Sequence, residues 1–243
     1  MMNRTLLLFL LAALAFGCKE VKDPFQLPEY DDAPYYPLEI GKFWEYRVDS
    51  TIFDANAPEP IRFDSIFVRE EVVDTFLDLQ SHAWYRIERF ERASDTLPWE
   101  IKQVVAATIR GNEALRLEND LTFVKLLFPL TPFKGWNGNK YFDPLTVVFI
   151  SGEPVEMFKN WDYRLLSTAA PEMGYSDVAT IRQADSENLL ERRYALEKYA
   201  RDTGLIYREL EILDDTLTLD ENIPWEQKAQ KGFKLTQTLL KTN

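Results

Sequence analysis

The sequence predicts a mainly β protein: a curved antiparallel meander sheet or a partly closed β-barrel, with one or two short helices. Three observations predict this fold class. Apolar and polar residues alternate along many short segments, turn residues separate these segments, and aromatic residues are frequent at the apolar positions. Alternation indicates strands that bury one face, and one-sided burial is typical of antiparallel rather than parallel sheets.

The clearest alternation begins at residue 43, where Trp44, Tyr46 and Val48 alternate with charged residues. The same pattern recurs at residues 85–88, 115–118 and 161–165. Turn signals separate the segments at residues 56–60, 95–98, 110–112, 136–139 and 202–204. Because a curved sheet of about eight to eleven strands would use these segments and hide most strand edges, we expect that size.

Two later segments need separate interpretation. Residues 186–200 have a helical pattern, with Ser186 as a possible cap, but the turn at 202–204 leads directly into alternating residues 205–213. We favour a strand hairpin over a helix here. Residues 224–232 begin with proline and end with glycine, which predicts a short helix before a last strand at 233–240.

The N-terminus is typical of an export signal. Arg4 precedes the apolar residues 5–16, a run shorter than the roughly 20 residues of a membrane-spanning helix. Residues 14–18 read LAFGC and resemble the bacterial lipobox, although Phe16 is unusual there. Cys18 is the chain's one cysteine, and acylation would explain an unpaired thiol in an exported protein. The alternative is an ordinary secreted protein with a free thiol.

These features predict three parts. Residues 1–17 are a lipoprotein signal peptide, residues 18–37 are the acylated Cys18 and a flexible proline-rich tether, and residues 38–243 are a single β-rich domain. Lys19 occupies the position that resembles the lipoprotein sorting site, where aspartate commonly means retention in the inner membrane. Lysine there favours the outer membrane, with the periplasmic and cell-surface faces both open.

The charge balance limits the partners. The chain has 40 acidic against 28 basic residues and a net charge of −12, so its surface should repel the phosphates of nucleic acids. We therefore exclude nucleic acid as the main partner. The expected contact with the membrane is the N-terminal lipid, because no basic amphipathic helix adds an electrostatic attraction.

The sequence shows no readable catalytic centre, which favours a protein that is not an enzyme. His82 is the single histidine and precedes a strand, where a turn position is the simplest interpretation. A His/Cys zinc site is unavailable, and the motifs G-x-S-x-G, G-x-G-x-x-G and the P-loop are missing. Acidic residues 214–222 lack the order of an EF-hand calcium loop. We predict no metal and no cofactor.

Aromatic residues are the main positive feature, with 6 Trp, 11 Tyr and 16 Phe. Most should fill the core, and the remainder could line a ligand cavity in a curved sheet. Trp99, Trp136 and Trp161 lie near turns and are the candidate ligand-binding residues.

The predicted function is a non-catalytic envelope lipoprotein that binds an apolar or carbohydrate ligand, or a partner protein of the envelope. One alternative is a carboxylate-based glycan hydrolase, since two carboxylates suffice for that chemistry. The other is a purely structural envelope scaffold, which would show an exposed apolar patch without a cavity.

Residues 36–46 (YPLEIGKFWEY) resemble the opening Y-P-L-x-x-G-x-x-W-x-Y of uncharacterised Bacteroidetes-type outer-membrane lipoproteins. Three later blocks look like the same group and occur in the same order, at residues 136–139, 198–209 and 225–232. The resemblance implies an exported, β-rich lipoprotein. That group has no established activity to transfer.

Overall fold

The computed structural model of the protein describes residues 30–218 and 220–243. The predicted signal peptide and Cys18 lie outside these residues. Within them, fourteen strands form a large antiparallel sheet and a small hairpin, which confirms the predicted mainly β fold class. Over the same residues, no helix combines the length and the apolar character needed to cross a membrane.

The strands of the large sheet lie in the order β6-β5-β4-β3-β2-β1-β14-β13-β12-β11-β10-β7. Their bounds are β1 Phe43–Asp54, β2 Ile61–Leu77, β3 Ala83–Arg92, β4 Glu100–Arg110, β5 Glu113–Glu118, β6 Leu121–Leu127, β7 Gly135–Trp136, β10 Trp161–Glu172, β11 Tyr175–Glu187, β12 Glu191–Ala200, β13 Gly204–Asp214 and β14 Lys231–Thr242. The small hairpin pairs β8 (Val148–Ile150) with β9 (Glu153–Val155), and the helices are the 3-10 turn η2 (Ala33–Tyr35) and α2 (Trp225–Lys228).

The sheet is a meander in which most consecutive strands are neighbours. The first strand, β1, also pairs antiparallel with the last strand, β14, in the middle of the sheet. The sheet contains 12 strands, so the expectation of eight to eleven was too low. One of the 12 is β7, whose two residues are too short to show an alternating pattern.

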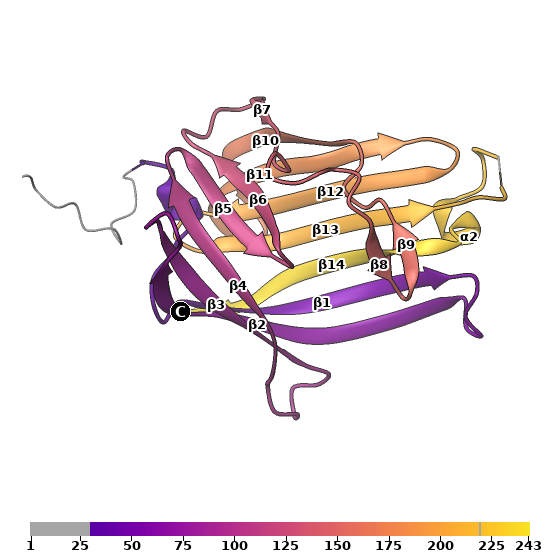
Figure 1. The fold of residues 1–243 in the computed structure, drawn as a ribbon, viewed down its shortest axis with the longest axis horizontal. Coiled ribbons are helices and arrows are strands. Elements are labelled where there is room, and N and C mark those ends of the chain that lie inside the picture. Colours follow the sequence, from indigo (N-terminus) through magenta and orange to yellow (C-terminus); the bar gives the residue numbers. More distant parts are fainter. Residues whose placement is uncertain (1–29, 219) are drawn as a thin grey trace, which may run out of the picture.

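The sheet curls until its two edges nearly meet. Strands β3–β6 fold back across the long strands β11–β14 (Figure 1). At the edges, the backbone N–H of Val124 on β6 donates to the carbonyl of Gly138 at 2.8 Å, and Trp136 Nε1 donates to the carbonyl of Val124 at 2.9 Å. The curled sheet therefore encloses its inner face, as the prediction of a partly closed sheet required.

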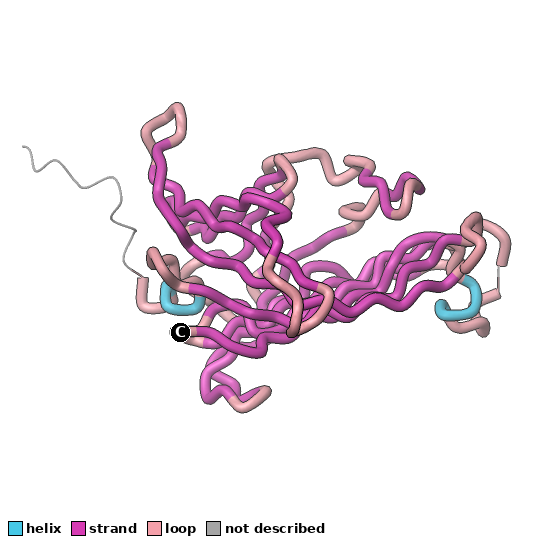
Figure 2. The backbone as a smooth tube through the Cα atoms, turned by 90° about the horizontal axis from the view of Figure 1, so that it is seen from below, coloured by secondary structure: helices cyan, strands magenta, loops and turns pink. Residues whose placement is uncertain are grey.

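Residues 30–37 lie against the domain, although the prediction placed them in the tether. Tyr35 is buried, and its hydroxyl donates to Asp177. The Tyr36 hydroxyl donates to the carbonyl of Leu115 at 3.2 Å. The tyrosine side chains give this proline-rich segment enough apolar surface to pack at one end of the long strands, opposite the end that holds α2 (Figure 2).

The two ambiguous segments fold as favoured. Residues 191–200 form β12, which pairs with β13 in a hairpin, so the helical reading of 186–200 is wrong. The segment forms a strand because alternate residues, among them Ala195 and Tyr199, are buried on one face. The short helix before the last strand is α2, a single turn.

Candidate functional site

A cavity of about 500 Å³ lies within the curled sheet. Its lining comes from β3, β5 and β6 on one side and from β10–β14 on the other, and residues 146–150 cover part of it. Strands β8 and β9 lie against β14, which places this cover over the long strands (Figure 1). The volume falls within the range of roughly 300–1,000 Å³ that small-molecule sites occupy.

Strand register separates the long-strand wall into a polar row and an apolar row. The polar row is Glu197, Arg208 and Gln237, which are paired across β12, β13 and β14. The apolar row, one step further along the same face, is Ala195, Leu210 and Leu235. Phe233 continues the apolar surface on β14. The cavity therefore has a charged end and an apolar end.

Aromatic rings extend the apolar surface. Phe158 packs edge-on against Trp161, with ring centroids 5.4 Å apart, and lies 5.5 Å from Phe123. Trp161 in turn lies 5.9 Å from Tyr163. Such edge and tilted contacts hold rings in fixed positions and stabilise beyond their buried area. This part of the wall is a rigid aromatic surface.

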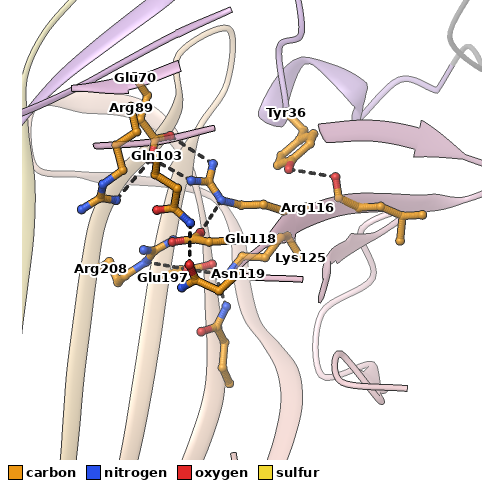
Figure 3. A network of polar contacts seen from close by, with 12 residues as sticks. Tyr36, Glu70, Arg89, Gln103, Arg116, Glu118, Asn119, Lys125, Glu197 and Arg208 are labelled. Atoms are coloured by element: carbon orange, nitrogen blue, oxygen red, sulfur yellow. Dashed lines mark hydrogen bonds and ion pairs between the residues drawn. The ribbon is translucent and has the colours of Figure 1, made fainter. Parts of the chain in front are cut away.

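Glu197 is the centre of the charged end. Its carboxylate is fully buried and accepts four hydrogen bonds. The donors are Lys125 Nζ at 2.6 Å, Arg208 Nε at 2.8 Å, Gln183 Nε2 at 2.6 Å and the Tyr199 hydroxyl at 2.7 Å. Lys125 and Arg208 share one carboxylate oxygen, Oε1 (Figure 3).

Arg116 forms the second half of the charged end. Its terminal nitrogens donate to both oxygens of Glu70, at 2.7 and 3.0 Å, and its Nε donates to Glu118 at 2.8 Å. Arg89 also contacts Glu70, at 3.5 Å, and Glu91, at 3.3 Å. Figure 3 shows the group around Arg116 close to the group around Glu197. Paired donors of this kind are strong and directional.

The cations keep both cavity carboxylates ionised. Burial opposes ionisation of Glu197, but Lys125 and Arg208 outweigh it and lower its pKa to about 2. Burial also opposes ionisation of Glu118, and Arg116, Arg208 and Arg89 together hold its pKa well below the usual range. A general acid needs a raised pKa, so neither carboxylate is suited to protonate a glycosidic oxygen at neutral pH. The geometry does not favour the hydrolase alternative.

The pKa of Lys125 is shifted in the direction that favours its neutral form. Burial lowers the pKa of its ammonium to about 8, Glu197 opposes the shift, and Arg208 and Arg116 add to it. The Lys125 side chain therefore remains a cation at pH 7.

The three predicted tryptophans lie in different places. Trp161 lines the cavity. Trp136 lies behind the lining, packed 5.8 Å from Tyr163, so it shares that ring with Trp161. Trp99 follows the β3–β4 turn, where the Arg92 guanidinium lies 4.2 Å from its ring, and it lies away from the cavity. His82 is half-exposed before β3 beside Asp78, at the expected turn.

The sequence analysis did not predict the charged end of the cavity, although one pattern in the sequence indicates it. Arg208 shares a face with Ile206 and Leu210 in the alternation of residues 205–213, and Glu197 shares a face with Ala195 and Tyr199. A charged residue in a series of apolar ones indicates a buried ion pair. The ion-pair partner of Glu197, Lys125, lies on a strand 72 residues away in sequence, so no local pattern identifies the pair.

Over residues 30–218 and 220–243, no group of three or more His, Cys, Asp or Glu side chains is arranged to hold a metal ion. In the acidic stretch at 214–222, the Asp215 carboxylate accepts hydrogen bonds from the backbone of Leu217 and Thr218. The Asp215 carboxylate therefore stabilises the turn that follows it.

No protein-family model and no curated protein matches the sequence. Among solved structures, the fold is similar to a protein from Bacteroides fragilis NCTC 9343 described as exported and as having a YmcC-like fold. The TM-score is 0.44 at 8% identity, over 86% of this chain and 98% of that one. It is also similar to a protein from Parabacteroides distasonis ATCC 8503 described as a lipoprotein, with TM-score 0.39 and 14% identity over the same shares.

Proposed function

We propose that this protein is a lipid-anchored envelope protein that binds an apolar ligand within its curled sheet, without catalysing a reaction. The observation that carries the proposal is the cavity of about 500 Å³, whose wall includes Leu210, Leu235, Phe233 and an aromatic surface. An apolar lining open to water is costly, at about 25 cal/mol per Å². A ligand that covers this surface removes the cost.

The lining favours an apolar ligand over a carbohydrate. A sugar needs hydrogen-bonding partners along its length, and the side chains of Leu210, Phe233 and Leu235 offer none at the apolar end of the cavity. The aromatic rings opposite cover part of one another, because Phe158 packs edge-on against Trp161 and is tilted against Phe123. A purely structural scaffold needs no such cavity.

The envelope location is supported by the N-terminal sequence. The lipobox-like residues 14–18 provide the acylation site at Cys18, and Lys19 favours sorting to the outer membrane. The resemblance of residues 36–46 to Bacteroidetes-type lipoproteins supports the same location.

The neutral apolar fluorophore N-phenylnaphthylamine tests the binding function. The mature chain carrying Cys18→Ser is used, so that no acyl anchor or detergent competes for the cavity. We expect saturable fluorescence enhancement that Leu235→Trp weakens, because the larger ring takes up part of the cavity beside Leu210. The matched control is Leu240→Trp on the same strand, at a residue 55% exposed, which should leave binding unchanged.

Two outcomes contradict the binding function. One is an absence of saturable binding by the folded wild type. The other is equal binding by the Leu235→Trp and wild-type proteins, which would place the fluorophore elsewhere. Native mass spectrometry of the protein purified from its own membranes adds an independent measurement: a co-purifying apolar molecule is expected.

A further inference from the structure

Lys125 and Arg208 have hydrogen-bond donors that the described residues leave unused. Lys125 is buried, and its ammonium donates to Glu197 alone, although an ammonium has three N–H donors. Arg208 donates to the same carboxylate through Nε, while its two terminal nitrogens donate to no described residue. Both side chains line the cavity.

The other charges at this end place positive groups toward the cavity. The cavity is lined by Arg89, Arg116, Lys125 and Arg208, and by only two carboxylates, Glu118 and Glu197. The remaining carboxylate partners, Glu70 and Glu91, contact Arg116 and Arg89 from outside the lining. A chain with a net charge of −12 thus presents four cations and two carboxylates to its interior cavity.

Lys125 and Arg208 lie close enough together for one ligand group to use the free donors of both side chains. Since Lys125 and Arg208 both hydrogen-bond Oε1 of Glu197, at 2.6 and 2.8 Å, one small headgroup can contact both. An anionic oxygen group accepts such charge-assisted hydrogen bonds well, and a planar guanidinium can donate two at once. A cationic headgroup would be repelled, and a neutral hydroxyl would satisfy fewer donors.

We propose that the ligand of this cavity is an anionic amphiphile, whose carboxylate or phosphate accepts hydrogen bonds from Lys125 and Arg208 while its acyl chain lies along Leu210, Leu235 and Phe233. The proposal rests on the binding function proposed above and adds the chemical class of the ligand. The chain and the headgroup are placed by strand register, because the polar row and the apolar row are consecutive on the same face.

The state of Lys125 agrees with an additional anion. Burial and the two neighbouring guanidinium groups lower the pKa of the Lys125 ammonium to about 8, although Glu197 opposes the shift. An anionic headgroup beside the ammonium would add a negative charge and raise that pKa again.

Displacement of N-phenylnaphthylamine tests the ligand class with four single-chain competitors of equal length: dodecanoate, dodecyl phosphate, dodecanol and dodecyltrimethylammonium. We expect at least one of the two anions to bind about tenfold or more tightly than dodecanol, because charge-assisted hydrogen bonds to buried cations discriminate by that much. The cation should bind most weakly. The stronger of the two anions distinguishes a fatty acid from a phosphorylated lipid.

Variants test whether Lys125 and Arg208 cause the preference for an anionic headgroup. Lys125→Met and Arg208→Gln should each reduce the anion-to-alcohol ratio about tenfold while the affinity for dodecanol is kept. Lys125→Arg and Arg208→Lys retain the charge and should retain the preference for an anion. The matched control is Lys102→Met, which removes an exposed lysine of β4 paired with Glu100.

The outcomes separate the two proposals. If no competitor displaces the fluorophore and none binds, the binding function itself fails. If dodecanol, the anions and the cation compete equally, an apolar ligand remains and the anionic class is overturned. The wild-type selectivity decides this even if Lys125→Met or Arg208→Gln fails to fold, and melting temperatures identify that case.

Discussion

Glu197 shows how a single side chain organises both the stability and the chemistry of the interior. Four donors from β6, β11, β12 and β13 converge on its two oxygens. A buried ion pair of this kind adds little over a well-packed apolar core, but removing one partner leaves the other charges uncompensated. The loss of Glu197 alone should therefore be costly, although the complete ion pair adds little over an apolar core.

Glu197→Gln should lower the free energy of unfolding by about 3–5 kcal/mol, because Lys125 and Arg208 lose their shared counter-charge. Denaturant unfolding of the variant and wild type measures this difference. The control is Glu100→Gln, which breaks an exposed pair with Lys102 and should cost at most about 1 kcal/mol. Equal losses for the two variants would show that the buried network has no special role.

The same carboxylate gives an acid dependence with a defined sign. Its pKa is about 2 in the folded protein against an ordinary value of 4.5, so the unfolded chain binds the proton more readily. The stability it contributes is present above pH 4.5 and is lost as the pH falls toward 2. Unfolding midpoints across this range should fall more steeply for the wild type than for Glu197→Gln.

Lys125 predicts a base dependence of ligand binding. The folded-state pKa of about 8 means that Lys125 loses its charge as the pH rises through 8. Affinity for dodecanoate should then fall between pH 7 and 10, while affinity for dodecanol stays constant. The other charges facing the ligand do not titrate there, because Glu118 and Glu197 are ionised and the guanidinium groups stay charged. A fall of equal size in Lys125→Met would contradict the assignment.

At the scale of elements, alternation predicted where strands lie but not what covers each face. In β5, Leu115 and Leu117 were the expected core residues, with Arg116 and Glu118 facing water. In the structure Leu115 and Arg116 are both buried. The curled sheet encloses the face of Arg116, and Trp136 packs on the face of Leu115. A local pattern cannot show this, because both coverings come from residues distant in sequence.

Gly232 is the element-scale feature that fixes how β14 pairs with β13. Its φ is +114°, and a Cβ there would lie 1.9 Å from the carbonyl oxygen of Ile212. Gly232→Ala should lower the free energy of unfolding by at least about 2 kcal/mol, through backbone strain and this contact. Gly152→Ala in the β8–β9 turn is the control, since φ is also positive there, at +87°, but no atom lies within 4 Å. Chemical denaturation should show a clearly smaller loss for Gly152→Ala.

For the whole molecule, the sequence predicted a curved antiparallel sheet but not its closure. The Asn-Gly turn at 136–139 looked like a hairpin, yet it leaves β7 and bridges to β6, where Trp136 and Gly138 contact Val124. That contact brings the two edges of a 12-strand sheet together, and the cavity lies inside the resulting curl. Edge-to-edge contact between strands that are not consecutive depends on the accumulated curvature of all the strands between them. No single segment encodes it.

The proposed location of the whole molecule depends on acylation of Cys18, since a chain with a net charge of −12 is not attracted to anionic lipids. A single acyl chain binds membranes weakly and reversibly, so stable attachment requires more than one chain on the cysteine. Cys18→Ser should abolish incorporation of labelled palmitate and release the protein from membrane fractions. Lys19→Asp provides the matched control: acylation should persist, while density-gradient fractions shift from the outer to the inner membrane. If Cys18→Ser is fully processed and still sediments with membranes, another part of the chain holds the protein there, and the anchor must be reassigned.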